Sequence, residues 1–221
     1  MISNRKILHS SFVRYGALPL GLIVLVVVLR LFFFLPFRVM TSAQSPDLRL
    51  GAWALARRSH SPKHGDIVLF RLPSLRGRTP GALHLGRIVA LPGDSIELRA
   101  GRLVVNEEEV HDYRHEINPT ESYALRLPRE GGVYPITSTN LVAYRSALLQ
   151  ESKLYPSAPD EVTLEGTDPK HWLKALAKNP YHTFRRDYYW VLTDQTQAAP
   201  DSRHLGILPA DVILGIVLFS L

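Results

Sequence analysis

One apolar run in the chain is far longer than the others. Residues 16–37, with the sequence GALPLGLIVLVVVLRLFFFLPF, carry a single charge, at Arg30. As a helix this run would extend about 33 Å at roughly 1.5 Å per residue, which exceeds the hydrocarbon core of about 30 Å in a bilayer. Arg30 lies toward the end of the run, where its side chain can reach the lipid–water interface. The run therefore predicts one transmembrane helix.

The charges that flank this run predict its orientation. Arg5, Lys6 and Arg14 precede it, without an acidic side chain among them. Basic residues favour the cytoplasmic side of a membrane. Residues 1–15 are therefore expected in the cytoplasm, and residues 38–221 on the far side of the membrane.

A cleaved signal peptide is the alternative interpretation of the same run. Thr41 and Ala43 resemble the small residues that precede a cleavage site. The apolar run is long for a secretory signal, however, and this length favours a permanent anchor.

Beyond residue 38 the apolar runs are short and are separated by Gly, Pro and Asp, which is typical of β-strands joined by turns. The last run is too short for a second membrane span of about 20 residues. Ala100 and Gly101 lie between two runs and predict a hairpin. The exported part is therefore expected to be mainly β. The expected strands are residues 53–57, 66–70, 85–91, 95–98, 102–105, 188–192 and 212–219.

Two helical signals interrupt these strands. Asn140 is a suitable N-cap for a helix that begins LVAYRSALLQ. Asp168 followed by Pro169 is the capping pattern expected before KHWLKALAK. Residues 112–186 or so are therefore expected to form a mixed α/β insertion in the β domain.

The amino-acid composition excludes several kinds of catalytic and binding site. The chain has no cysteine, which excludes disulfides, thiolate metal ligands and a cysteine nucleophile. Five of the 26 basic side chains precede residue 39, which leaves 21 against all 20 acidic ones, so no nucleic-acid partner is expected for the exported part. The nine histidines lack metal-ligand spacing, and no glycine-rich phosphate loop is present. We expect no metal and no cofactor.

Four ordered segments resemble the conserved boxes of bacterial type I signal peptidases (leader peptidases, peptidase family S26). The resemblance implies a signal-peptidase-like β core behind one membrane anchor. In that family a serine hydroxyl attacks the peptide carbonyl, a neutral lysine takes the serine proton, and hydroxyl and backbone N–H groups stabilise the oxyanion. The segments are TSAQSPDLRLG at residues 41–51, HGDIVLFRLP at 64–73, GRIVALPGDSIELRAGRLVVN at 86–106 and DQTQAAPDSRHLG at 194–206.

The resemblance places unreactive residues at both reactive positions. Alignment on Pro46 puts Ala43 where the family has its nucleophilic serine, and alignment on Arg87 puts Gly86 where it has its general-base lysine. Ala199 replaces a serine that positions this lysine. A methyl group cannot attack a carbonyl, and glycine has no side chain to take a proton. No intact catalytic pair is therefore expected.

Other positions of the family pattern remain. Thr41 keeps a hydroxyl at the oxyanion-donor position, whereas Thr196 replaces an arginine of the last box. The loss is selective, because groups that support the fold remain and groups that touch the reacting atoms are gone. The retained supporting residues are Arg87, Asp94, Asp194, Asp201, Ser202 and Arg203.

A rearranged catalytic pair is an alternative. Ser42 and Ser45 flank Ala43, and His84 lies two residues before Gly86, so that on a strand both would share one face. Related eukaryotic signal peptidases use histidine as the base. Against such a pair, misplacement of a reacting group by 1 Å costs about 100-fold in rate.

These features favour a catalytically inactive pseudoenzyme in the bacterial inner (cytoplasmic) membrane, with its main domain on the periplasmic side. Its cleft would bind exported preproteins or signal peptides by β-strand addition, or assist their assembly. Secretion machinery or an active paralogue would be further partners. Two alternatives remain: an active signal peptidase I with a rearranged pair, and an accessory subunit of a secretion or membrane complex.

Overall fold

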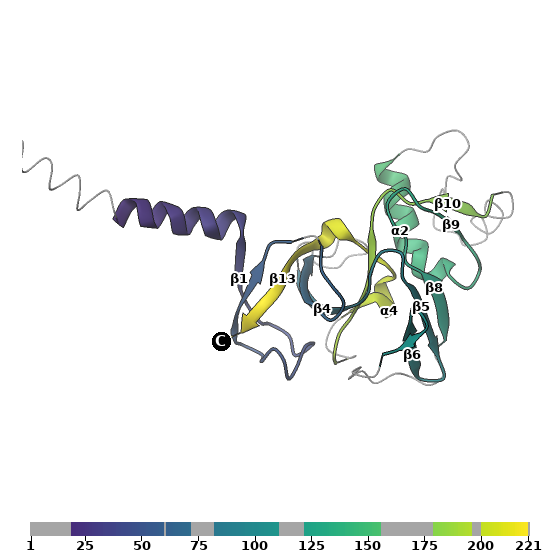
Figure 1. The fold of residues 1–221 in the computed structure, drawn as a ribbon, viewed down its shortest axis with the longest axis horizontal. Helices are drawn as coiled ribbons and strands as arrows, with labels where there is room; N and C mark the ends of the chain where they lie inside the picture. Colours follow the sequence, from purple (N-terminus) through teal and green to yellow (C-terminus); the bar gives the residue numbers. More distant parts are fainter. Residues whose placement is uncertain are drawn as a thin grey trace, which may run out of the picture.

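The computed structural model describes residues 19–59, 61–71, 82–110, 122–155, 179–195 and 200–220. Figure 1 shows a helix that projects from one end of a β-rich body. The expected cytoplasmic segment at residues 1–15 and the expected helix at 170–178 lie outside the described residues.

The long apolar run begins as a helix and continues as a strand. Residues 19–32 are helical, and strand β1 follows at Phe34–Arg38. The prediction of a helix up to residue 37 is wrong, because Pro36 has no amide N–H for a helical hydrogen bond and its segment pairs with a neighbouring strand instead. No helix in the described part of the chain is long and apolar enough to cross a membrane.

The junction between this helix and β1 is a single residue, Phe33. Its backbone N–H donates to Leu29 O at 2.9 Å, which closes the last helical turn. Its carbonyl oxygen accepts a hydrogen bond of 2.8 Å from Arg58 N, at the end of the strand beside β1. The end of the helix is therefore joined to the sheet by a direct backbone hydrogen bond.

A seven-stranded antiparallel sheet forms the first part of the body. Its strand order is β1-β2-β13-β3-β4-β11-β12. The strands expected in this sheet are confirmed to within two residues, because alternating apolar positions bounded by turn residues identify them well. These confirmed strands are β2 (Trp53–Arg57), β3 (Ile67–Arg71), β4 (Leu83–Ala90), β11 (Tyr188–Leu192) and β13 (Ile213–Ser220). The sheet also contains β1 and β12 (Leu208–Pro209), which the sequence did not predict as strands.

A four-stranded sheet of order β7-β6-β5-β8 forms the second part. The expected hairpin is confirmed as β5 and β6, and its turn residues Ala100 and Gly101 have φ values of 50° and 78°, as a type I′ turn requires. The strands are β5 (Ser95–Arg99), β6 (Arg102–Val105), β7 (Glu108–Glu109) and β8 (Tyr123–Arg126), while β9 (Val133–Pro135) and β10 (Tyr181–Thr183) pair separately.

The helix expected after Asn140 is α2, Leu141–Leu154. Asn140 does not cap it with its side chain, contrary to the prediction. Its amide oxygen accepts from Thr137 N at 2.8 Å, and its amide nitrogen donates to Pro135 O at 2.9 Å. The residue therefore fixes the loop between β9 and α2, a role that asparagine shares with helix capping.

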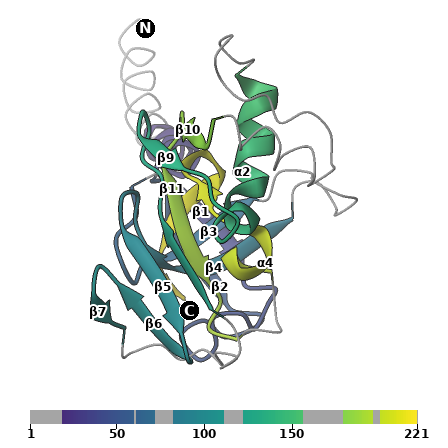
Figure 2. The same cartoon turned by 90° about the vertical axis from the view of Figure 1, so that its right-hand side faces the viewer.

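The last box contains the short helix α4 (Ser202–Leu205), and the 3-10 turn η1 (Ala210–Val212) follows it. Figure 2 shows α2 and α4 on one side of the body and β5, β6 and β7 on the other.

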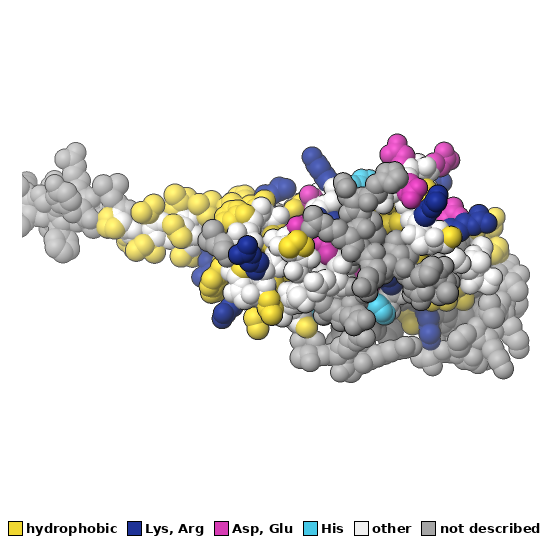
Figure 3. Space-filling model, turned by 90° about the horizontal axis from the view of Figure 1, so that it is seen from below, with side chains coloured by type: hydrophobic (Ala, Val, Ile, Leu, Met, Phe, Trp, Pro, Cys, Tyr) yellow, Lys and Arg dark blue, Asp and Glu magenta, His cyan; other side chains and the backbone are white. Residues whose placement is uncertain are grey.

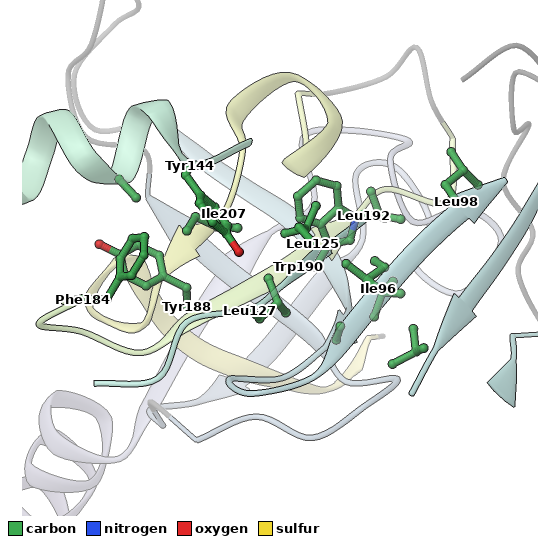
Figure 4. Close-up of a cluster of buried hydrophobic side chains, with 14 of the residues drawn as sticks. Ile96, Leu98, Leu125, Leu127, Tyr144, Phe184, Tyr188, Trp190, Leu192 and Ile207 are labelled. Atoms are coloured by element: carbon green, nitrogen blue, oxygen red, sulfur yellow. The ribbon is translucent and has the colours of Figure 1, made fainter. Parts of the chain in front are cut away.

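The largest buried cluster joins both sheets to α2. Trp190 and Leu192 of β11 lie in one cluster with Ile96 and Leu98 of β5, and Tyr144 of α2 belongs to the same cluster beside Phe184, with ring centroids 5.4 Å apart (Figure 4). A second cluster lies around the alternate β11 residues. It comprises Val68, Phe70, Ile88, Tyr189, Val191, Leu208, Ile213 and Ile216. β11 therefore packs into a different cluster on each of its two faces.

The contact between α2 and α4 can be tested at Gly206. Gly206 has a φ of 79°, and an added Cβ would collide with the carbonyl oxygen of Ala143 in α2. We expect Gly206→Ala to lower the free energy of unfolding by about 2–4 kcal/mol, because backbone strain and overpacking combine. Urea unfolding followed by tryptophan fluorescence measures the loss.

Gly101→Ala is the matched control. Gly101 has a φ of 78° and no atom within 4 Å of an added Cβ. Backbone strain alone should cost about 1 kcal/mol there. Equal losses in the two variants would contradict the close approach of α4 to α2.

Candidate functional site

The position of the expected nucleophile holds a buried methyl group. Ala43 lies in a turn between β1 and β2, and its side chain has no exposed surface. Its carbonyl oxygen accepts a 3.0 Å hydrogen bond from Gln195 N, just after β11. The turn is thus attached to the chain that follows β11, but residue 43 offers no atom that could attack a substrate.

The expected oxyanion donor is engaged by this same turn. The hydroxyl oxygen of Thr41 accepts a hydrogen bond of 3.1 Å from the backbone N–H of Ala43. That N–H group therefore points to Thr41, whereas an oxyanion hole needs donors directed at the reacting carbonyl.

The position of the expected base is filled by neighbouring side chains. An added Cβ at Gly86 would collide with Val191 Cγ1 of β11, and would lie 3.3 Å from Phe70 Cε1 of β3 and 3.4 Å from Leu192 O. Only the absence of a side chain lets these strands pack as they do. A lysine at this position would have to displace Val191.

Arg87 is the centre of an ion-pair network beside this position. Its guanidinium donates to Asp194 at 2.8 and 3.2 Å, to Asp47 at 2.6 Å and to Gly65 O at 3.0 Å. The hydrogen bond to Asp194 is the main reason that the pKa of Arg87 is raised, although burial opposes it. The pairing of Arg87 with Asp194 brings together two expected supporting residues. Asp47 was not predicted.

A second network fixes the end of β11. Burial by itself would raise the pKa of Asp201, but hydrogen bonds from Arg203 and from Thr193 N lower it below its ordinary value. The neighbouring Ser202 hydroxyl oxygen accepts from Val191 N at 2.9 Å. Asp201, Ser202 and Arg203 therefore hold in place the strand whose Val191 fills the base position.

Asp94 has a separate structural role, between β4 and β5. Its carboxylate accepts hydrogen bonds from Leu91 N at 2.6 Å, Asn106 Nδ2 at 2.8 Å and His64 Nε2 at 2.7 Å. Burial favours a higher pKa for Asp94, but these three donors lower it. Asp94 thus holds the loop that connects the two sheets.

The alternative catalytic residues are placed as follows. Ser42 and Ser45 lie in the turn around Ala43, where Ser42 O accepts from Ser45 N at 2.9 Å. His84 stacks on Phe70 with ring centroids 5.6 Å apart, and Phe70 also borders Gly86. His84 and Gly86 therefore share a face of β4, as expected. A catalytic pair of His84 with Ser42 or Ser45 stays a prediction.

Gln44 is a further member of the site that the sequence did not indicate. Its side chain is fully buried, and its Nε2 lies 3.5 Å from Leu192 O. Its Oε1 has no hydrogen-bond partner. A buried acceptor without a partner costs about 1–3 kcal/mol. No local sequence signal could have identified it, because burial at this turn depends on the distant β11.

Two of the expected family positions, Thr196 and Ala199, lie outside the described residues. Within the described ranges, His, Asp and Glu side chains do not gather in a group of three that could hold a metal ion.

The chain is similar to proteins of one known family. The profile of the family described as "Signal peptidase, peptidase S26" matches residues 12–221, and the chain belongs to this family. The signal peptidase I of Pseudomonas aeruginosa is 30% identical over 92% of this chain and 70% of its own length. The corresponding protein of Buchnera aphidicola is 23% identical over 99% of this chain and 80% of its own.

Among solved structures, a signal peptidase I from Enterococcus faecalis is 19% identical, with a TM-score of 0.34. The match covers 72% of this chain and 97% of that one.

The packing at Gly86 can be tested with a double-mutant cycle. We expect Gly86→Ala to lower the free energy of unfolding by about 1–3 kcal/mol, because its Cβ overpacks the contact with Val191. Adding Val191→Ala should recover part of this loss, because it removes the methyl group that collides. Chemical denaturation of the two single variants and the double variant measures the coupling. Additive losses would contradict the contact.

The role of Asp201 predicts a pH dependence. Its pKa in the folded chain is below the ordinary value of 3.8, so the unfolded chain binds the proton first as the pH falls. Its contribution to stability is complete well above pH 3.8 and decreases below it. Asp201→Asn should cost about 3 kcal/mol at neutral pH, because it removes the buried negative charge that pairs with Arg203. The variant should also lose less stability on acidification. An unchanged acid slope in denaturation curves would contradict this role.

Proposed function

We propose that this protein is a non-catalytic member of the signal peptidase family that binds exported preprotein chains. The observation that carries the proposal is the filled position beside Gly86, where Val191 occupies the space of a base side chain. Ala43 adds that no hydroxyl is available at the nucleophile position. Loss of both groups removes the attack and the proton transfer on which hydrolysis depends.

Retention of the supporting residues argues for a binding role. Arg87 and Asp201 still connect β4, β11 and the turn at Ala43 through ion pairs and hydrogen bonds. A chain that had lost all use for this site would not need to keep the segments around it in place. The site is therefore maintained as a surface for a ligand.

An extended chain would bind along β4, beyond the end of β11. β3 pairs with β4 from Leu83 to Arg87, whereas β11 pairs with it from Arg87 to Ala90. Among the described residues no strand pairs with the other side of Leu83, Leu85 and Gly86, and an added strand would form its backbone hydrogen bonds there. Signal peptides and the preprotein regions next to them are the substrates of the family, and they suit this mode of binding.

The helix at residues 19–32 supports location at a membrane. Its apolar side chains are exposed, with Arg30 as the one charged residue among them, and Figure 3 shows hydrophobic side chains along the face of the helix that it draws. A helix with this much exposed apolar surface requires an apolar environment. We infer attachment to the bacterial cytoplasmic membrane, with the β domain on the extracytoplasmic side.

The proposal predicts binding without cleavage. Full-length protein incubated with a preprotein should give no mature product on a gel, under conditions in which an active signal peptidase I does. A photoreactive amino acid at Leu83, which is 46% exposed beside the site, should crosslink to the preprotein. The same probe at Val142, 82% exposed on α2, should not.

Other outcomes would favour the alternatives. Mature product that disappears in His84→Ala would establish a rearranged catalytic pair, because His84 shares its face of β4 with Gly86. Crosslinks from Val142 but not from Leu83 would instead favour an accessory subunit that uses α2.

A further inference from the structure

The turn that carries Ala43 covers the interior of the site. Residues 42–47, which we call the lid, hold Ala43 and Gln44 without exposed surface. The turn is closed by hydrogen bonds from Ser45 N to Ser42 O and from Leu48 N to Gln44 O, at 2.9 and 2.8 Å. An added chain at β4 therefore reaches the backbone of residue 43 only if the lid moves.

An ion pair fixes the outer end of the lid. Asp47 accepts from Arg87 at 2.6 Å, and its side chain is 39% exposed. Arg87 is also held by Asp194 and by Gly65 O, which are not part of the lid. Because the Asp47 side chain is partly exposed, water can reach its carboxylate when it separates from Arg87, which keeps its other acceptors.

The inner part of the lid opposes closure. Gln44 Oε1 is buried without a partner, and Nε2 makes only a long contact of 3.5 Å with Leu192 O. An acceptor in this state gains a hydrogen bond as soon as water or a ligand can reach it. The closed lid is thus held by the Asp47–Arg87 ion pair and by the bond from Gln195 N to Ala43 O, and it contains one group that disfavours closure.

We propose that residues 42–47 open and close over the site, that the Asp47–Arg87 ion pair controls the opening, and that a backbone N–H of the bound chain becomes the partner of Gln44 Oε1. This inference rests on the proposed binding function and adds its regulation. The ligand recognised is an extended peptide backbone, which presents N–H donors whatever its sequence.

A single amide reports on the lid. Gln195 N donates to Ala43 O at 3.0 Å, so this bond must break when the lid moves. Ile88 N donates to Asp66 O at 2.9 Å, between β4 and the start of β3, and does not depend on the lid. Hydrogen exchange of Gln195, with Ile88 as the internal reference, therefore measures opening in the full-length protein.

The first test removes the charge of Asp47. We expect Asp47→Asn to speed exchange at Gln195 about two- to fivefold, as the loss of a partly exposed ion pair implies, without a change at Ile88. Binding of a labelled synthetic peptide with alanine at the −1 and −3 positions should tighten by a similar factor, because the open form becomes more populated. High salt should speed exchange in the wild type and have little effect in the variant.

Asp211→Asn is the matched control, because Asp211 is an exposed carboxylate paired with Arg186 far along the chain from the lid. It makes the same change in charge and should leave exchange at Gln195 unaltered. Faster exchange in both variants would assign the effect to net charge and would overturn the role of the ion pair.

The second test removes the unpartnered oxygen. Gln44→Met keeps the length of the side chain, and we expect it to slow exchange at Gln195 about fivefold while the free energy of unfolding is unchanged or higher. The peptide should bind more weakly. In the double variant with Gln44→Met and Asp47→Asn, exchange at Gln195 should return toward the wild-type rate, but the peptide should still bind more weakly than to the wild type. This result would separate the opening of the lid from the hydrogen bond that Gln44 Oε1 accepts.

The results distinguish this inference from the proposed function. If the wild type does not bind the peptide while both variants change exchange as expected, the lid stands and the binding function fails. If the wild type binds the peptide but exchange is the same in Asp47→Asn, the binding function stands and the lid is overturned. Faster exchange in Gln44→Met would also overturn it, because Gln44 would then stabilise the closed form.

Discussion

The packing of three strands around Gly86 determines what this site can do. β4 places Gly86 between Phe70 of β3 and Val191 of β11, and the side chain of Val191 occupies the space that a base would need. A side chain added at residue 86 would therefore require a change in β11 as well as in β4. The ion pairs of Arg87 and Asp201 hold the segments around Gly86 in this arrangement.

Much of the fold was predictable from the sequence. β2 and β11 have the bounds expected for them, because apolar residues between Gly, Pro and Asp identify buried strands. The family pattern also indicated which charged residues support the site, and Arg87 does pair with Asp194, as Asp201 does with Arg203.

The features that could not be predicted depend on contacts between distant segments. Val191 is an ordinary strand residue until the register of β11 against β4 places it beside Gly86. Asp47 and Gln44 likewise acquire their roles from Arg87 and Leu192, which are far away in the sequence. The end of the helix at residue 32 was missed because hydrophobicity alone does not distinguish a helix from a strand in a short apolar segment.

The one-residue junction at Phe33 has a mechanical consequence. Because Phe33 is hydrogen-bonded both to the helix and to Arg58, no slack separates the helix from the seven-stranded sheet. Any tilt or rotation imposed on the helix by its surroundings must be passed to β1 and to the strands beyond it. The helix and the seven-stranded sheet therefore act together as one lever, without a flexible linker between them.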